Sequence, residues 1–105
     1  MTDKRIVLTT AGSKDEAAKI ASALVERRLA ACVNVVGPMA STYRWQGKVE
    51  RADEFLLIVK TTAAAIDGAR DAVKQLHSYD VPEFVVLGIE GGSATYLDWI
   101  AENVS

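Results

Sequence analysis

The sequence predicts an α+β fold in which two helices cover one face of a four-stranded antiparallel sheet. Two amphipathic helical stretches, near residues 13–28 and 62–77, alternate with segments of β-type periodicity. An almost wholly apolar run from Phe55 to Val59 marks a strand that is buried on both sides. With 105 residues, half of them apolar, the chain is large enough for one core but not for two. We therefore expect a single domain over residues 1–105.

The first strand and the first helix follow from the N-terminal part of the chain. Residues 4–10 (KRIVLTT) have the length and apolar content of a strand. Ser13 and Glu16 then show the Ser-x-x-Glu spacing of a capping box, which marks the N-terminus of a helix. Apolar residues recur every three to four positions from there to about Arg28. This stripe predicts a helix that packs on a sheet.

The next segment predicts a long β-hairpin. Residues 30–36 (AACVNVV) alternate with a period of two, and Gly37-Pro38 predicts a bulge or bend because proline cannot donate to a ladder. Strand character resumes at residues 41–45 (STYRW). Gln46-Gly47 then predicts a tight turn into a return strand over residues 48–61.

The C-terminal part predicts a helix, a strand and a short closing helix. The second helix should end near His77, and residues 81–90 (VPEFVVLGIE) predict the fourth strand. Gly91-Gly92-Ser93 predicts a turn and an N-cap before a helix that includes residues 96–100. The resulting order, β-α-β-β-α-β-α, is that of a ferredoxin-like split β-α-β sandwich with a short C-terminal helix.

Two helices cover only one face of such a sheet. The other face, apolar on the central strands, would be exposed in a monomer, and an apolar patch of that size usually binds a partner subunit. Long strands that extend past the domain would also offer edges for pairing between subunits. The sequence therefore predicts a homo-oligomer.

Charge and composition exclude several classes of function. The formal net charge is -2 and no run of Lys and Arg is longer than a pair, so we expect no nucleic-acid partner. No window approaches about eighteen uninterrupted apolar residues, and MTDKRIVLTT lacks the long apolar region of a secretory signal. The single cysteine, Cys32, cannot form an intramolecular disulfide. We expect a cytoplasmic protein with no membrane partner.

The stretch LHSYDVPEF, residues 76–84, holds the only histidine of the chain. A thiolate from Cys32, the imidazole of His77 and the carboxylate of Glu83 would make a workable ligand set for copper or zinc. The spacing, however, contains no Cys-x-x-Cys or His-x-x-x-His chelate. The alternative is structural: Cys32 as buried packing, His77 as a C-terminal helix residue and Glu83 as a solvated charge.

A second group of residues predicts a pocket for a small ligand. Charged residues at the ends of an apolar strand, together with aromatic residues, could line a pocket between subunits for a small anion or metabolite. The candidates are Tyr43, Trp45, Glu54, Lys60, Tyr79 and Trp99. The alternative is that the aromatic residues pack the subunit interface and that the Lys60 stem lies along apolar surface.

Catalysis has little support in the sequence. Cys32 is embedded in an apolar strand, which disfavours a reactive thiolate. Nucleophile-elbow, P-loop and dinucleotide motifs are absent from the chain. We therefore expect a binding protein and not an enzyme.

Five stretches resemble one known family in their order and spacing. They are RLAACVNVV, STYRWQGKVE, FLLIVKTT, LHSYDVPEF and YLDWI. Together they resemble the CutA family of divalent-cation-tolerance proteins, over nearly the whole chain from Ile6 to Ile100. The resemblance implies a ferredoxin-like subunit in a compact homotrimer, and a role in the response to copper and other divalent metal ions.

The family motifs place the metal candidates residue by residue. Cys32 matches the cysteine of the family's Ala-Ala-Cys-Val motif. His77, Tyr79, Pro82 and Glu83 match its His-Pro-Tyr-x-x-Pro-Glu signature, in which Ser78 stands where proline is usual. The resemblance implies a metal site that uses Cys32, His77 and a carboxylate such as Glu83 or Asp80, completed from a neighbouring subunit.

We accordingly expect a non-enzymatic, cytoplasmic homotrimer that binds copper or a similar divalent cation weakly. The alternative function is that of a trimeric small-ligand sensor similar to the PII-like signalling proteins, which share this subunit plan. A nucleotide sensor would need clustered Arg and Lys side chains, whereas Lys60 stands nearly alone.

Overall fold

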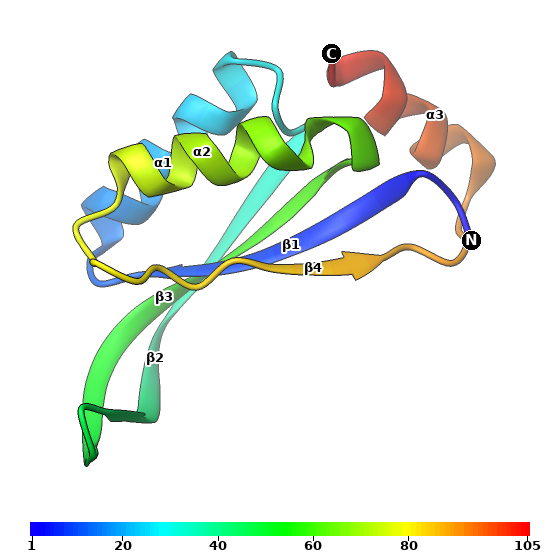
Figure 1. The fold of residues 1–105 in the computed structure, drawn as a ribbon. Coiled ribbons are helices and arrows are strands. Elements are labelled where there is room, and N and C mark those ends of the chain that lie inside the picture. Colours follow the sequence, from blue (N-terminus) through cyan, green and yellow to red (C-terminus); the bar gives the residue numbers. More distant parts are fainter.

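The computed structural model, which describes residues 1–105, is a four-stranded antiparallel sheet with its helices on one face (Figure 1). The elements are β1 (Lys4–Ala11), α1 (Lys14–Glu26), β2 (Cys32–Trp45), β3 (Lys48–Thr62), α2 (Ile66–Leu76), β4 (Val85–Gly88) and α3 (Ala94–Asn103). A 3₁₀ turn, Ala63–Ala65, leads into α2. The strand order across the sheet is β2-β3-β1-β4, so the predicted ferredoxin-like class is confirmed. No helix has the length and apolar character needed to cross a bilayer.

Helix α1 begins where the capping motif predicts. The Ser13 hydroxyl oxygen accepts a hydrogen bond from the Glu16 amide at 3.1 Å. The Glu16 carboxylate, however, does not return to the backbone of Ser13 as a full capping box would require, because it binds Ser78 instead. The helix ends at Glu26, two residues before the predicted end, and Arg28 adopts a left-handed conformation with φ 59°.

Strands β2 and β3 form a long twisted hairpin whose tip projects beyond the helices (Figure 1). Their pairing runs from Cys32 opposite Lys60 to Trp45 opposite Lys48, with an irregularity between Val36 and Met39 at the predicted bulge. At the tip, Gln46 and Gly47 have φ of 50° and 79°. Positive φ at both central residues is the mark of a type I′ turn, so the predicted hairpin is confirmed.

The core lies between the sheet and the two long helices. Leu57 and Val59 of β3 and Val7 of β1 are completely or almost completely buried, and they pack in one cluster with Ile20 and Leu24 of α1. Because side chains alternate along a strand, the even-numbered residues of β1 and β3 point to the opposite side. The alternation on β3 therefore separates a core face from a second apolar face.

We call this second face the open sheet face, defined by Ile6, Leu8, Ile58, Val85 and Leu87. Leu8 is opposite Ile58 on β3 and Val85 on β4, while Ile6 is opposite Leu87, so these side chains share one side of the sheet. No helix covers this side in Figure 1. The two β4 residues are exposed, and the others are half-buried. Within one subunit, the β3 apolar run is thus covered by helices on one side only.

Strand β4 is shorter than predicted, covering Val85–Gly88 and not residues 81–90. Pro82 has no amide hydrogen for a ladder bond, and the preceding residues are attached through side chains. The Thr9 hydroxyl donates to the Glu83 carbonyl at 2.6 Å, and a His77 ring nitrogen lies 2.6 Å from the Thr10 carbonyl oxygen. Residues 77–84 therefore follow β1 without forming a strand.

Candidate functional site

The segment from His77 to Glu83 is fixed to the body of the protein at its first two residues. The His77 side chain is fully buried, with Nε2 on the Thr10 carbonyl and Nδ1 3.1 Å from the Tyr79 amide and 3.2 Å from Glu16 Oε1. Ser78 donates from its amide and its hydroxyl to the Glu16 carboxylate. This network holds the segment between α1 and β1, and so positions Tyr79.

These contacts also define what His77 does within one subunit. Metal coordination requires a ring nitrogen with a free lone pair, and both nitrogens of His77 are engaged with protein groups. His77 is the C-cap of α2, as the structural alternative expected. In this arrangement its role is to anchor the segment that follows.

Tyr79 and the buried Glu54 form the polar centre of the site. The Tyr79 hydroxyl donates to Glu54 Oε2 at 3.0 Å, and Glu54 is only 8% exposed. Burial, together with the bond to Glu54 and its negative charge, raises the pKa of Tyr79 to about 12. The hydroxyl therefore remains a donor at neutral pH. A Cβ at Gly12 would lie 2.9 Å from this hydroxyl, so a glycine leaves the space that Tyr79 occupies.

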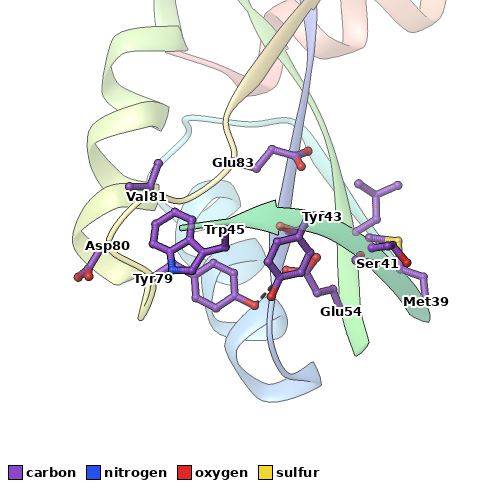
Figure 2. Close-up of a pocket in the computed structure, with 12 residues that line it drawn as sticks. Met39, Ser41, Tyr43, Trp45, Glu54, Tyr79, Asp80, Val81 and Glu83 are labelled. Atoms are coloured by element: carbon purple, nitrogen blue, oxygen red, sulfur yellow. Dashed lines mark hydrogen bonds between the residues drawn. The ribbon is translucent and has the colours of Figure 1, made fainter. Parts of the chain in front are cut away.

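A pocket of about 600 Å³ opens in front of this pair (Figure 2). Met39 is opposite Glu54 in the sheet, and the alternation of β2 places Ser41, Tyr43 and Trp45 on the same side of the hairpin. The other wall is the segment from Tyr79 to Glu83. Thr10 and Leu56 also line the pocket. Both belong to the side of the sheet that carries the open sheet face, so the pocket is continuous with that face.

The charged groups of the pocket are all acidic. Glu54, Asp80 and Glu83 line it, and none of the twelve lining residues is Lys or Arg. Partial burial raises the pKa of the Glu83 carboxyl group, and the nearby charge of Glu54 raises it further. The pocket thus concentrates negative charge with no cation of the same subunit to balance it.

The structure brings together four of the six residues predicted for a ligand pocket: Tyr43, Trp45, Glu54 and Tyr79. Glu83, predicted as a metal ligand, joins them. Lys60 and Trp99 lie outside the pocket. Lys60 hydrogen-bonds to Asn34, and Trp99 stacks on Tyr96 of α3 with ring centroids 5.5 Å apart.

Cys32 and His77 are not neighbours within the subunit. Cys32 is paired with Lys60, which is itself opposite Ile6, whereas His77 contacts Thr10. Ile6 and Thr10 are four residues apart along β1, which is roughly 13 Å at the rise of a strand. The thiol also faces the helix-free side of the sheet, where its Sγ lies 3.7 Å from the Asn34 side-chain oxygen. A metal site that includes both residues would require a second subunit.

Several residues that build the site were not predicted from the sequence, among them Thr10, Met39 and Glu16. Thr10 and Met39 line the pocket, and Glu16 fixes Ser78 and His77. The Ser-x-x-Glu motif predicted a local role for Glu16. The contact of Glu16 with Ser78 joins residues far apart in the chain and leaves no signal in the local sequence. Met39 follows the Gly37-Pro38 bulge, which makes its facing impossible to deduce from alternation alone.

Replacing Glu83 by glutamine is expected to stabilise the folded protein slightly at neutral pH. Folding raises the pKa of this carboxyl group above its usual 4.5. At a pH between the unfolded and the folded pKa, the folded state therefore binds more protons than the unfolded state, and its stability falls as the pH rises through this range. Glutamine removes the repulsion from Glu54. Because Glu83 is exposed as a residue, the gain should stay below about 1 kcal/mol, and it should vanish below pH 4.5.

Thermal unfolding midpoints of both proteins, measured at neutral pH and below pH 4.5, check this expectation. Glu50→Gln on the hairpin, outside the pocket, is the matched control and should show no gain that depends on burial. A lower midpoint for Glu83→Gln at neutral pH would show that the carboxylate is stabilising where it stands.

Comparison with known proteins agrees with this architecture. The family model described as CutA1 divalent ion tolerance protein matches residues 5–103. The divalent-cation tolerance protein CutA of Thermus thermophilus is 52% identical over 100 residues, which cover 95% of this chain and 97% of that protein. A solved structure of the divalent cation tolerance protein from Thermus thermophilus has a TM-score of 0.95 at 51% identity, covering 97% of this chain and 99% of the other. CutA of Xylella fastidiosa has a TM-score of 0.96 at 36% identity, covering 99% and 100%. The chain therefore belongs to the CutA1 family of divalent ion tolerance proteins.

Proposed function

We propose that the protein is a non-enzymatic, homotrimeric divalent-cation-binding protein of the cytoplasm, and that copper is the ion it holds best, though weakly. The family name supports the divalent cation. The observation that carries the proposal is the convergence of the Glu54 and Glu83 carboxyl groups on one pocket that contains no Lys or Arg. A cation between them would relieve the repulsion that raises the Glu83 pKa.

The chemistry of the donors suits a weakly bound ion. Two carboxylates from one subunit supply fewer ligands than a tight site needs, and no group of three or more His, Cys, Asp or Glu side chains in the subunit could hold a metal. Water or a second subunit would fill the remaining positions. Copper(II) is the preferred ion because a given site of nitrogen and oxygen ligands binds it more tightly than the other divalent first-row metals.

Cys32 and His77 enter this proposal only through assembly. Both ring nitrogens of His77 are hydrogen-bonded within the subunit. Cys32 is paired with Lys60, distant along the sheet from Thr10, which His77 contacts. The predicted ligand set of Cys32, His77 and Glu83 would need a second subunit and a rearranged His77. We therefore assign copper first to Glu54 and Glu83.

Assembly into a trimer is supported by the uncovered apolar side of the sheet. An obligate interface resembles a domain core cut in half, and the open sheet face has that composition. Because the pocket is continuous with this face, a second subunit would border the pocket and could add ligands to it. The proposed trimer and the proposed cation site are thus linked.

The alternative of an anion or nucleotide sensor has less support. A phosphate site needs cationic side chains or clustered backbone donors, and the charged lining of the pocket is wholly acidic. Lys60, the one cation predicted for the site, lies elsewhere and binds Asn34. The pocket favours ligands of positive charge.

Calorimetric titration with copper tests the cation site. We expect Glu54→Gln and Glu83→Gln to weaken the apparent copper affinity at least tenfold, on the order of the change seen when a metal-site partner is lost. Binding by the wild type should also weaken as the pH falls through the raised pKa of Glu83, because the protonated carboxyl group no longer ligates.

The matched control is Cys32→Ala, which leaves the pocket intact. Equal heats from Cys32→Ala and the wild type would agree with a carboxylate site. Loss of the heat in Cys32→Ala with full retention in Glu83→Gln would refute the assignment to the carboxylates and favour the thiolate. A His77→Ala titration on protein shown to be folded would separate a ligand from an anchor.

A further inference from the structure

Three aromatic side chains, those of Tyr43, Trp45 and Tyr79, line the acidic pocket. Tyr43, Trp45 and Tyr79 are 43%, 44% and 37% exposed, and their rings make no stacking contact among themselves. Figure 2 shows them grouped around the same space as the carboxyl groups of Glu54 and Glu83. The Tyr79 ring contacts the His77 ring, with centroids 4.6 Å apart, so only its exposed part can reach a ligand. The rings of Tyr43 and Trp45 have no aromatic partner within the chain and are available to a ligand.

A hydrated metal ion would use little of this lining. Copper bound by two carboxylates needs neither aromatic rings nor a space of about 600 Å³. The faces of Trp and Tyr attract organic cations, which shed water more easily than a small divalent ion does. The apolar side chains of Met39 and Leu56 in the wall would contact the carbon atoms of such a ligand.

The polar groups of the pocket match an ammonium head. Glu54 is more than nine-tenths buried, and its Oε2 accepts from Tyr79 while its Oε1 has no hydrogen bond within the chain. Glu83 lines the pocket with no side-chain partner. An ammonium group carries three donors and no acceptor, so these carboxylate oxygens are suitable partners.

From this lining we infer that the pocket binds a primary ammonium ion carried on a compact apolar body, with its head on Glu54 and Glu83 and its body against Tyr43, Trp45 and Tyr79. The inference rests on the cation-binding role proposed above and extends it to an organic ligand. Amines and divalent ions would then compete for the same carboxylates. The aromatic rings would matter only for the amine, which makes the two ligands separable by mutation.

A pair of isosteric probes tests the inference on the wild-type protein. Protonated tert-butylamine and tert-butanol have nearly the same shape and differ in charge. We expect the amine to shift the backbone NMR signals of pocket residues saturably at neutral pH, and the alcohol to bind at least about tenfold more weakly. Sodium chloride at matched concentration controls for ionic strength.

Variants then assign the contacts. Trp45→Leu, at an exposed position near the hairpin tip, should weaken the amine about three- to tenfold and leave copper heats unchanged. Glu54→Gln, which retains an acceptor for the Tyr79 hydroxyl, should weaken both ligands. Trp99→Leu is the matched control, because Trp99 is similarly exposed but lies on α3 outside the pocket, and it should change neither.

Each outcome decides between the possibilities. Equal binding of tert-butanol would overturn the inference by showing an apolar cavity only. Amine shifts that are unchanged in Trp45→Leu would overturn the aromatic contact. Copper heats with no amine binding at millimolar concentration would overturn the inference and leave the proposed function standing, as expected if a side chain of a second copy fills the pocket. Amine binding without copper heats would refute the proposed metal and retain the amine site.

Discussion

Replacing Leu57 by aspartate is expected to leave the chain unfolded or insoluble. Leu57 is completely buried on β3, in the cluster that joins the sheet to α1 and α2. Removing a buried leucine side chain costs about 2 to 5 kcal/mol, and an unpaired carboxylate in its place adds several more. The total stability of a domain is only about 5 to 15 kcal/mol. The substitution should therefore consume most or all of it.

Circular dichroism and the soluble fraction after expression measure this effect. Leu57→Met, which nearly conserves the volume, is the matched control and should cost less than about 1.5 kcal/mol. A soluble Leu57→Asp protein with a native spectrum and a cooperative thermal transition would contradict the assignment of Leu57 to the core.

The neighbouring residues of β3 show what the sequence can and cannot predict. The apolar run from Phe55 to Val59 correctly predicted a central strand, and its burial on both sides stays a prediction because helices cover only one side. It did not reveal which side the helices cover, because both alternating sets are apolar. The contacts of Leu57 with α1 residues resolve that question. A substitution at Leu57 therefore tests the core, and a substitution at Leu8 tests the open sheet face.

Local signals were reliable where the chemistry is local. Ser13 caps α1, Ser93 caps α3, and Gln46-Gly47 forms the hairpin turn, each through contacts within three residues. The fourth strand was predicted too long because the residues that flank Val85–Gly88 are also largely apolar. Pro82, which lies before the strand, has no amide hydrogen to donate to the ladder. Side-chain hydrogen bonds from Thr9 and His77, and not ladder bonds, attach residues 77–84 to β1.

The candidate site was only partly predictable because its key contacts join distant residues. Glu54 and Tyr79 are 25 positions apart, and Glu16 and Ser78 are 62 apart. A single sequence gives no measure of such pairs. The signals that did exist were a lone histidine at a helix end and a carboxylate at the head of an apolar strand. The carboxylate of Glu54 lines the pocket, whereas His77 lies outside the lining and anchors the segment that contributes Tyr79. The anion alternative depended on Lys60, which lies outside the pocket and hydrogen-bonds to Asn34.

The open sheet face connects the fold to the proposed site. Thr10 and Leu56 lie two residues along their strands from Leu8 and Ile58, on the same side of the sheet, and both line the pocket. A subunit that packed on this face would therefore also approach Glu54 and Glu83. Loss of assembly should weaken cation binding even where the pocket residues are unchanged.

Replacing Leu8 by aspartate is expected to convert the proposed homotrimer to monomers. Leu8 lies at the centre of the open sheet face, between Ile58 and Val85, and it is half-buried within the subunit. In a monomer the new carboxylate can reach water, so the fold should persist. In an assembly each subunit would bury one unpaired charge at the interface, at a cost of several kcal/mol per charge. Every few kcal/mol lowers the association constant by orders of magnitude.

Native mass spectrometry at micromolar concentration, with and without copper, reports subunit number and metal count together. Val25→Asp is the matched control, because Val25 is 41% exposed on α1, away from the open sheet face, and this variant should assemble as the wild type does. Leu8→Asp should appear as a folded monomer with a lower copper count. Trimers of Leu8→Asp at the wild-type population would show that subunits meet elsewhere, and a monomeric wild type would refute the proposed assembly. Either result would refute the proposed link between the open sheet face and the ligands of the Glu54 and Glu83 site.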